Sequence, residues 1–252
     1  VDALKGSTGL KKLKNGIQQN KYSWILDLHG NFRSIYLRSR YKKSQILTFK
    51  KHKFIRFLLV KFGVNLYKNI PPVYLRYIHS AAKLGLEYDG KGLDYKLDEY
   101  AVSKIKSLLS EQNCDSNKKT ICIAPGASFF TKRWPSEKYA KVAKQLQDEK
   151  DVQIVLLGGE KDKPISSEIA QTCLQPVFNF TGHLSLMETA CVLSFADLVL
   201  TNDTGVMHLA NSQKKQTIAI FGPTIKDLGF FPLEKISTVI ENTNLKCRPC
   251  TH

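Results

Sequence analysis

Two hydrophobic patterns alternate along the second half of the chain. Short, nearly continuous apolar runs occupy residues 120–125, 152–157, 177–180, 198–201, 217–221 and 237–241. Between them, apolar residues recur three and four positions apart in 136–149, 164–173 and 206–212. Runs of the first kind predict buried strands, and the second spacing predicts helices with one apolar face. Strands that alternate with helices predict an α/β fold, a parallel sheet with helices on both faces.

Two helices carry signals for their first residues. Ser136 is the expected N-cap of the helix over 136–149. Ser185 and Glu188 have the spacing of a capping box, in which each side chain bonds the other residue's backbone. The sequence therefore predicts a helix start at 136 and another at 185.

The first half has a less regular pattern. The apolar run 24–28 predicts a buried strand that feeds a loop, and 98–112 has helical spacing. A polar, turn-rich stretch follows at 113–119. We therefore expect two domains, 1–112 and 113–252, with the boundary at this stretch.

The two halves of the chain also differ in net charge. The formal net charge is +16, and residues 1–106 carry 22 Lys and Arg against 7 Asp and Glu. Residues 107–252 carry 16 against 15, so nearly all of the excess lies in the first half. This asymmetry indicates an anionic partner for the first half, namely nucleic acid, phospholipid or a phosphorylated glycan. Solubility alone is the simpler explanation and stays open.

One basic stretch combines charge with aromatic residues. Phe54, Phe57, Phe62 and Lys61 fit an amphipathic helix with a basic rim, which can lie on an anionic membrane or pack on an ordinary core. The sequence contains no zinc-finger spacing, RNP-like motif or basic heptad region, which disfavours a nucleic-acid module. Its apolar runs are too short to span a bilayer.

The six cysteines are too few for a disulfide scaffold. Cys247 and Cys250 have the spacing of half a zinc site. A reduced loop without metal is the alternative interpretation of this pair.

Candidate ligand residues gather where the predicted strands end, which is where open parallel sheets bind ligands. In 202–208, either Asp203 or Thr204 can cap the helix, whose free N–H groups suit a phosphate. His208 lies about one turn further along the same face. A structural cap and a packed histidine are the alternative interpretation.

Two further strand ends carry polar residues. Ser128 and Lys132 offer a hydroxyl and a cation to an anionic ligand, and Lys132 could stabilise a leaving diphosphate. Glu160 follows Gly158 and Gly159, where an acid often accepts ribose hydroxyls. A solvated basic loop is the alternative for Lys132, and none of these motifs is a Walker loop or a dinucleotide fingerprint.

Taken in order, these blocks resemble the ADP-heptose:lipopolysaccharide heptosyltransferases, glycosyltransferase family 9. The resemblance rests on Pro125-Gly126-Ala127-Ser128 with Lys132-Arg133-Trp134-Pro135, on Gly158 to Asp162, Thr181 to Leu186, Thr201 to Ala210, and Phe221 to Thr224. It implies a GT-B fold of two Rossmann-like domains with parallel sheets flanked by helices, the N-terminal one incomplete. It also implies inverting, metal-independent transfer of L-glycero-D-manno-heptose from ADP-heptose to the inner core, with no cofactor.

The resemblance also implies roles for single residues. Ser128 and Lys132 match positions near the donor diphosphate and sugar, and Glu160 matches the acid at the ribose. The diphosphate and heptose site is matched by Asp203, Thr204, Gly205 and His208. The family's general base is expected upstream of Val1, so the sequence names no catalytic residue.

The implied partners are a nucleotide-sugar donor, an acidic glycolipid acceptor and the anionic inner-membrane surface, with no nucleic acid. The implied location is cytoplasmic and peripheral to the inner membrane. Two alternatives stay open, namely a related transferase with another nucleotide-sugar donor and a non-catalytic basic module that binds nucleotides or nucleic acid.

Overall fold

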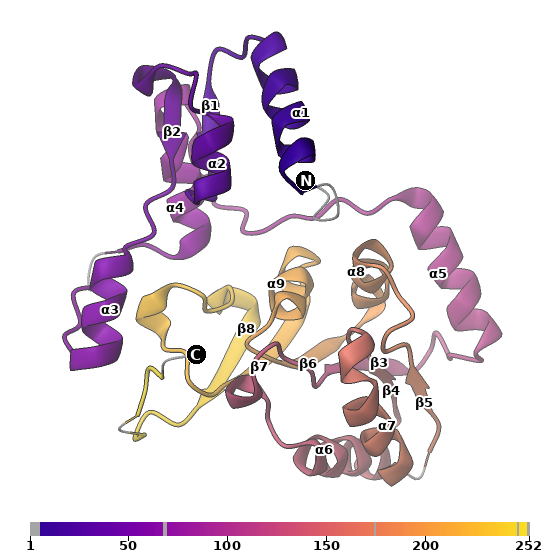
Figure 1. The fold of residues 1–252 in the computed structure, drawn as a ribbon. Helices are drawn as coiled ribbons and strands as arrows, with labels where there is room; N and C mark the ends of the chain where they lie inside the picture. The colour runs from indigo at the N-terminus through magenta and orange to yellow at the C-terminus, as the bar shows by residue number, and fades with distance from the viewer. Residues whose placement is uncertain (1–5, 68–69, 174, 246, 251–252) are drawn as a thin grey trace. The chain divides into compact units, whose positions relative to one another are not determined.

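The computed structural model describes residues 6–67, 70–173, 175–245 and 247–250 (Figure 1). The chain divides into two compact units, Val1–Gly90 and Lys91–His252. We describe each unit by itself, beginning with the second, which contains the candidate ligand residues.

The second unit is built on one sheet of six parallel strands. In chain order these are β3 (Lys119–Ala124), β4 (Val152–Leu156), β5 (Val177–Asn179), β6 (Leu198–Asn202), β7 (Gln216–Phe221) and β8 (Ser237–Glu241). Their spatial order is β5-β4-β3-β6-β7-β8, and every neighbouring pair is parallel. This is the doubly wound order of dinucleotide-binding domains, with the reversal of direction between β3 and β6. The predicted parallel α/β sheet is thus confirmed.

Helices cover both faces of this sheet (Figure 1). They are α5 (Glu99–Glu111), α6 (Ser136–Glu149), α7 (Lys163–Thr172), α8 (Leu186–Phe195) and α9 (Gly205–Ser212). Residues of α5, α8 and α9 share one core cluster with Cys122 and Ala124 of β3. Those of α6 and α7 share the other cluster with Ile121 and Ile123. Successive residues of β3 therefore face opposite layers, as a strand buried on both faces requires.

Helix α5 packs on the second unit, although the sequence assigned it to the first domain. Ile105 is fully buried in the cluster that also holds Leu193 of α8. Lys104 and Glu188 add an ion pair of 2.5 Å between the two helices. The structural division therefore falls between Gly90 and Lys91, before α5. The sequence placed the boundary between 112 and 113, at the polar stretch that follows α5.

The helix starts agree with the predictions in one case and differ in the other. The Ser185 hydroxyl accepts from the Glu188 N–H at 3.3 Å, and the Glu188 carboxylate accepts from the Ser185 N–H at 2.8 Å. The predicted capping box is thus confirmed. Ser136, however, is the first residue of α6 and not its N-cap, because Pro135 occupies that position with φ −55° and ψ 137°.

The first unit contains a smaller parallel pair of strands, β1 (Ile25–Asp27) and β2 (Ile46–Thr48). Its helices are α1 (Gly6–Gln19), α2 (Phe32–Leu37), α3 (Lys53–Phe62) and α4 (Val73–Ser80). Strand β1 and helix α3 were predicted, whereas β2, α2 and α4 are short and were missed. The prediction that the apolar run 24–28 is buried is wrong, because Trp24, Leu26 and Leu28 are 43%, 40% and 41% exposed. Among the described residues, no helix is long and apolar enough to cross a membrane.

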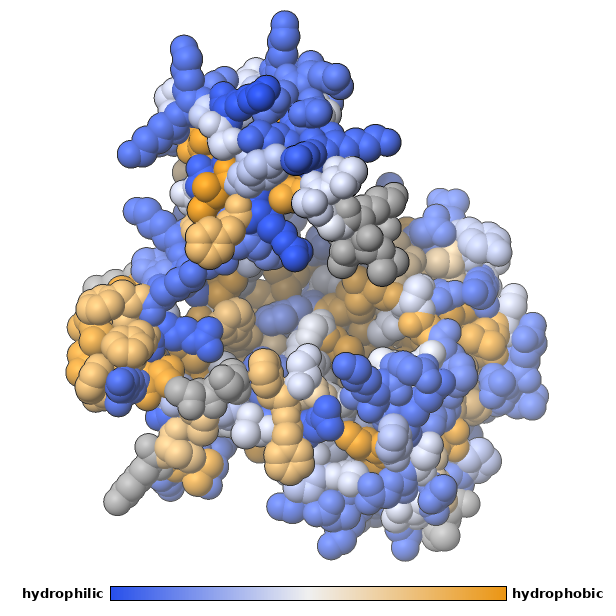
Figure 2. All heavy atoms as spheres, in the orientation of Figure 1, coloured by the Kyte–Doolittle hydropathy of each residue, from blue (hydrophilic) through white to orange (hydrophobic). Residues whose placement is uncertain are grey.

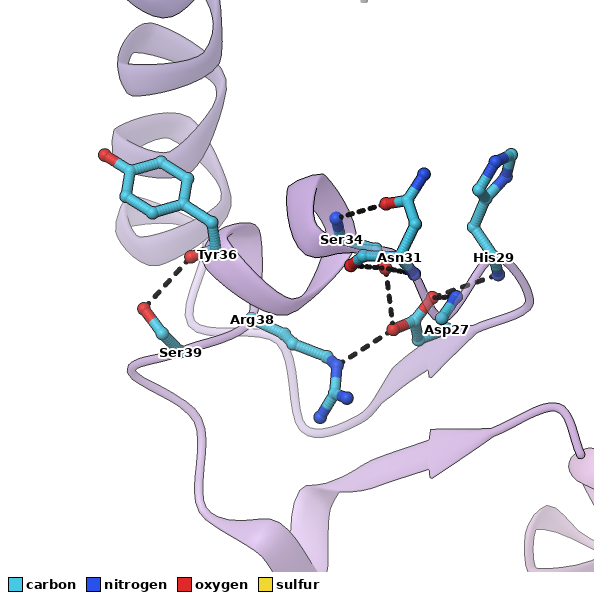
Figure 3. A network of polar contacts seen from close by, with 8 residues as sticks. Asp27, His29, Asn31, Ser34, Tyr36, Arg38 and Ser39 are labelled. Carbon is cyan, nitrogen blue, oxygen red and sulfur yellow. Dashed lines mark hydrogen bonds and ion pairs between the residues drawn. The ribbon is translucent and has the colours of Figure 1, made fainter.

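Asp27 holds the loop that follows β1 (Figure 3). Its carboxylate accepts bonds from the N–H groups of His29 at 3.0 Å and Gly30 at 2.7 Å. The Ser34 hydroxyl and the Arg38 Nε each donate to it at 2.9 Å. Burial raises the pKa of Asp27, but these donors outweigh burial and leave the pKa below its ordinary value. Asp27 is therefore an ionised residue that positions the loop and α2.

Candidate functional site

The carboxyl ends of β3 and β4 border a cleft of about 510 Å³ in the second unit. Its walls come from the loops after these strands and from the first turns of α8 and α9. Three of the predicted ligand residues line it, namely Ser128, Glu160 and Thr204. The cleft thus lies beside the point where the sheet reverses direction, where doubly wound domains bind their ligands.

Asp162 joins the two loops that form one wall of this cleft. Its carboxylate accepts the Gly159 N–H at 2.9 Å. It also lies directly over Gly126, where an added Cβ would meet the carboxyl atoms at 2.2 to 2.4 Å. Only glycine fits at position 126 unless Asp162 moves. Asp162 was quoted in the sequence motif without a role, and its contact with Gly126 gives it one.

Glu160 lies on the open side of the cleft. Its side chain is 74% exposed and forms an ion pair with Lys163 at 2.9 Å. Gly182 has a φ of +77°, and a Cβ there would approach the Glu160 carboxylate at 2.8 Å. The carboxylate has further lone pairs beyond the one used by Lys163, so it can accept hydroxyl groups from a bound ligand.

Asn202, at the end of β6, connects this strand to the loop after β3. Its side-chain amide donates to the Pro125 carbonyl at 2.7 Å. Its carbonyl accepts from the Trp134 N–H at 3.1 Å and from the Tyr139 hydroxyl at 2.9 Å. Asn202 is fully buried and cannot bond to water, so these protein hydrogen bonds satisfy its side-chain amide instead. Asn202 lies in the motif 202–208, where the sequence predicted no role for it.

Asp203 forms the charged centre beside the cleft. Its Oδ2 accepts from Lys132 Nζ and from the Thr224 hydroxyl, each at 2.6 Å. The Asp203 side chain is 6% exposed and that of Lys132 is 18% exposed, so the pair is largely shielded from water. The loop after β7 is close-packed here, because a Cβ on Gly222 would lie 2.6 Å from the Thr131 carbonyl oxygen. Loops after β3, β6 and β7 therefore meet at Asp203.

The first turn of α9 is left without a side-chain cap. Thr204 occupies the N-cap position, but its side chain makes no capping bond, and its hydroxyl lies 3.3 Å from that of Thr201. Asp203 is engaged by Lys132 and Thr224 instead. The prediction is thus confirmed for Thr204 as the N-cap residue, but neither side chain makes a capping bond, because Asp203 bonds Lys132 and Thr224 and the Thr204 hydroxyl lies against Thr201 of β6. The positive end of α9 is thus available to an anion.

Gly205 and His208 complete the predicted set. Gly205 is exposed, and a Cβ there would find no atom within 4 Å. His208 is half-buried, and burial is the main cause that lowers its pKa. Asp203 opposes this shift and Lys132 adds to it. Since the pKa of His208 lies below its ordinary value, its imidazole is neutral at physiological pH.

The cysteine pair near the C-terminal end forms a local contact. The Cys250 thiol lies 3.0 Å from the Cys247 carbonyl oxygen, to which it donates. Among the described residues, no group of three or more His, Cys, Asp or Glu side chains is arranged to hold a metal ion. His252 lies outside the described residues.

Comparison with known families gives one match over most of the chain. The family model described as "Glycosyltransferase family 9 (heptosyltransferase)" matches residues 10–252. This range includes both structural units and every predicted ligand residue.

Curated proteins with related sequences carry heptosyltransferase names. Lipooligosaccharide heptosyltransferase 2 of Campylobacter jejuni is 29% identical over 247 residues, which are 96% of this chain and 71% of that protein. Lipopolysaccharide heptosyltransferase 2 of Escherichia coli is 36% identical over 117 residues, 44% of this chain and 33% of that protein.

Solved structures agree with the fold. The E. coli ADP-heptose LPS heptosyltransferase II superimposes with a TM-score of 0.71 at 25% identity, over 92% of this chain and 72% of that one. A family 9 glycosyltransferase from Veillonella parvula gives a TM-score of 0.78 at 22% identity, over 96% and 71%. These likenesses confirm the predicted α/β fold of the GT-B class.

Proposed function

We propose that this chain, which belongs to glycosyltransferase family 9, transfers L-glycero-D-manno-heptose from ADP-heptose to the inner core of lipopolysaccharide. One observation carries the proposal. Three features lie together at the carboxyl ends of the strands, namely the cleft, the start of α9 without a side-chain cap, and the largely buried Lys132. A nucleoside diphosphate sugar needs these three features, namely space for the nucleoside, N–H donors for phosphate and a cation. The names of the relatives support heptose as the sugar.

In this proposal the adenosine occupies the cleft lined by Ser128 and Glu160. The Glu160 carboxylate accepts ribose hydroxyls. The diphosphate lies at the first turn of α9, where Thr204 and Gly205 present backbone N–H groups and the helix dipole favours negative charge. His208, neutral and one turn further on, is placed to donate a hydrogen bond to a phosphate oxygen or to the sugar.

The proposed chemistry is a single displacement with inversion at the anomeric carbon. The acceptor hydroxyl forms the new C–O bond as the bond to the diphosphate oxygen breaks, and the diphosphate takes the electron pair. Lys132 and the α9 N–H groups stabilise the charge that develops on this leaving group, so the proposal assigns no step to a metal. The hydroxyl proton passes to a general base, a role that the proposal assigns to none of the described residues.

The step in core assembly is proposed from the relatives. Several carry the name heptosyltransferase 2, which favours addition of the second heptose. The test is a transfer assay on core acceptors with and without the first heptose, read by the mass of the product. A product on the acceptor that already carries one heptose supports this step, and a product only on the heptose-free acceptor rejects it.

The first unit has the properties of a surface that meets anionic lipid. Residues 1–90 carry 18 Lys and Arg against 4 Asp and Glu. On α3, Phe54, Phe57 and Phe62 are 70%, 48% and 60% exposed, and Figure 2 shows apolar atoms gathered over this helix. Exposed rings on a basic helix suit a bilayer interface. We therefore propose a cytoplasmic location at the inner membrane, with an acidic glycolipid as acceptor.

Sedimentation with vesicles tests the membrane assignment. Vesicles that contain phosphatidylglycerol should retain the protein, and purely zwitterionic vesicles should not. The Phe54→Ser, Phe57→Ser double variant should bind less, whereas Phe130→Ser, which removes a still more exposed ring of the second unit, should bind as the wild type does. Equal binding by all three proteins would reject α3 as the membrane-binding element.

A further inference from the structure

Arg248 joins the end of β8 to the loop that follows β7. Its side chain is only 4% exposed. Its Nη1 donates to the Asn242 carbonyl at 2.7 Å, and its Nη2 donates to the Glu241 carboxylate at 2.6 Å and to the Thr224 carbonyl at 2.7 Å. Glu241 is the last residue of β8, whereas Thr224 lies in the loop after β7. Because the N–H groups of a guanidinium point in fixed directions, these bonds set the position of Thr224 relative to β8.

A second bond holds the same loop. The Cys250 N–H donates to the Pro223 carbonyl at 3.3 Å. Arg248 and Cys250 therefore bond the carbonyls of two successive residues, Pro223 and Thr224. Thr224 is only 3% exposed, so water has little access to replace the bond from Arg248. The loop after β7 is thus held at two adjacent points by residues 247–250.

Thr224 carries this restraint to the charged pair beside the donor cleft. Its carbonyl accepts from Arg248, while its hydroxyl donates to Asp203 Oδ2 at 2.6 Å. The same Oδ2 accepts from Lys132 Nζ at 2.6 Å. The side chains of Asp203 and Lys132 are 6% and 18% exposed, so this end of the series is also largely shielded from water. A displacement of Thr224 would therefore disturb the carboxylate that holds Lys132.

We propose that Arg248 is a positioning residue of the donor site, which holds the Lys132 ammonium in place through Thr224 and Asp203. Arg248 does not line the donor cleft, so its effect on a ligand passes through these contacts. A cation that is held in place stabilises a leaving diphosphate without the cost of reorganisation. The inference rests on the proposed function for the identity of the ligand, and it adds to that site a residue outside the cleft.

The test is calorimetric titration of the full chain with ADP in a double-mutant cycle of Arg248→Gln and Lys132→Ala. Glutamine removes the guanidinium that bonds Thr224 and Glu241. Lys118→Gln is the matched control. It removes one positive charge and an ion pair with Asp151 from the same unit, but just before β3, at the amino end of the strand.

Arg248→Gln should weaken ADP binding about tenfold in the wild-type background and have little effect in the Lys132→Ala background, since its effect passes through Lys132. Lys118→Gln should bind ADP as the wild type does. Equal weakening by Arg248→Gln in both backgrounds would show a general structural role and overturn the inference. If Arg248→Gln does not fold, Arg248→Lys takes its place in the cycle, because it keeps the charge but cannot bridge all three acceptors.

Two variants of Thr224 test the connection while Arg248 stays in place. Thr224→Val replaces the hydroxyl with a methyl group and keeps the carbonyl that Arg248 bonds, so ADP binding should weaken about as much as in Arg248→Gln. Thr224→Ser keeps the hydroxyl and should bind ADP as the wild type does. Equal ADP affinity in Thr224→Val and Thr224→Ser would overturn the inference.

A measurement on the free protein separates this inference from the proposed function. The nitrogen NMR signal of the Lys132 ammonium, identified by its loss in Lys132→Ala, reports the ion pair with Asp203 without any ligand. It should shift in Arg248→Gln and stay in place in Lys118→Gln. Such a shift in a protein that binds no ADP would support the role of Arg248 and reject the proposed donor. An unchanged Lys132 signal and wild-type ADP affinity in Arg248→Gln would overturn the inference and leave the proposed function intact.

Discussion

Lys132 Nζ lies 2.6 Å from Asp203 Oδ2, although the two residues are 71 positions apart in the chain. The contact joins the loop after β3 to the end of β6, the two strands between which the sheet reverses direction. It fixes a cation beside the uncapped start of α9. The contact therefore holds the Lys132 ammonium in place at this strand edge, and in the proposed function this cation and the start of α9 meet the donor diphosphate.

Replacement of Lys132 by Ala should cost stability as well as ligand affinity. It leaves the buried Asp203 carboxylate with the Thr224 hydroxyl but without its cation, so we expect a loss of about 1–3 kcal/mol in the free energy of unfolding. The double variant Lys132→Ala, Asp203→Asn removes the charge and should recover much of that loss. ADP affinity should stay low in both variants, as measured by urea unfolding and calorimetry. Full recovery of ADP affinity in the double variant would show that Lys132 acts only as a structural partner.

Gly126→Ala should disrupt the donor cleft. The new methyl group would lie 2.2 to 2.4 Å from the Asp162 carboxyl atoms, so Asp162 must leave Gly126 and release the Gly159 N–H. We expect a loss of stability of about 1–3 kcal/mol and weaker ADP binding. Gly205→Ala is the matched control for stability, because its methyl meets no atom within 4 Å. If Gly126→Ala is as stable as this control, Asp162 is not held as described.

Ile105→Ala should destabilise the second unit by about 2–5 kcal/mol, because Ile105 is fully buried in the cluster shared with α8. Lys106→Ala, an exposed position on the same helix, should have little effect. Urea unfolding followed by the fluorescence of Trp134, which packs in the second unit, measures both. If the urea midpoint reported by Trp134 is unchanged in Ile105→Ala, α5 does not stabilise the second unit. That result would favour the assignment of α5 to the first domain, as the sequence predicted.

His208 predicts a pH dependence of stability. Its pKa in the folded protein lies below that of the unfolded chain, so the unfolded chain binds more protons as the pH falls below about 6.5. Stability should therefore decrease toward acid through this group, by at most about 1.4 kcal/mol per pH unit. Urea midpoints at pH 7.5 and 5.5 should differ less in His208→Gln than in the wild type. The exposed His29→Gln variant is the control and should follow the wild type.

The elements of the second unit were predictable because their signals are local. A continuous apolar run such as 152–157 reflects a strand that is buried on both faces. Helical spacing such as that in 136–149 reflects a helix that is buried on one face. Parallel strands bring their carboxyl ends to one edge, so Ser128, Glu160 and Thr204 were expected together, and they line one cleft.

Other features depend on distances that no local pattern encodes. Asp203 was expected near the helix start, but whether it caps α9 or pairs with Lys132 depends on how three loops meet. The apolar face of 98–112 was evident, but the surface it packs against was not, so the domain boundary was placed after it. The short α2 and β2 contain too few residues for a period to emerge. Asp162 follows a glycine-rich strand end, and the pair of glycines before it is the signal that could have identified it.

We propose above all that the second unit binds ADP-heptose at the strand edge around Lys132 and Asp203. Calorimetric titration with ADP-heptose, ADP, UDP-glucose and a short oligonucleotide tests it most directly, with Lys132→Ala and Asp203→Ala alongside. We predict that ADP-heptose and ADP bind, that UDP-glucose binds at least about tenfold more weakly, and that both variants weaken ADP-heptose binding. Preference for UDP-glucose would keep the fold and reject heptose as the sugar. Salt-sensitive oligonucleotide binding without any nucleotide-sugar binding would contradict the account and identify a basic binding module instead.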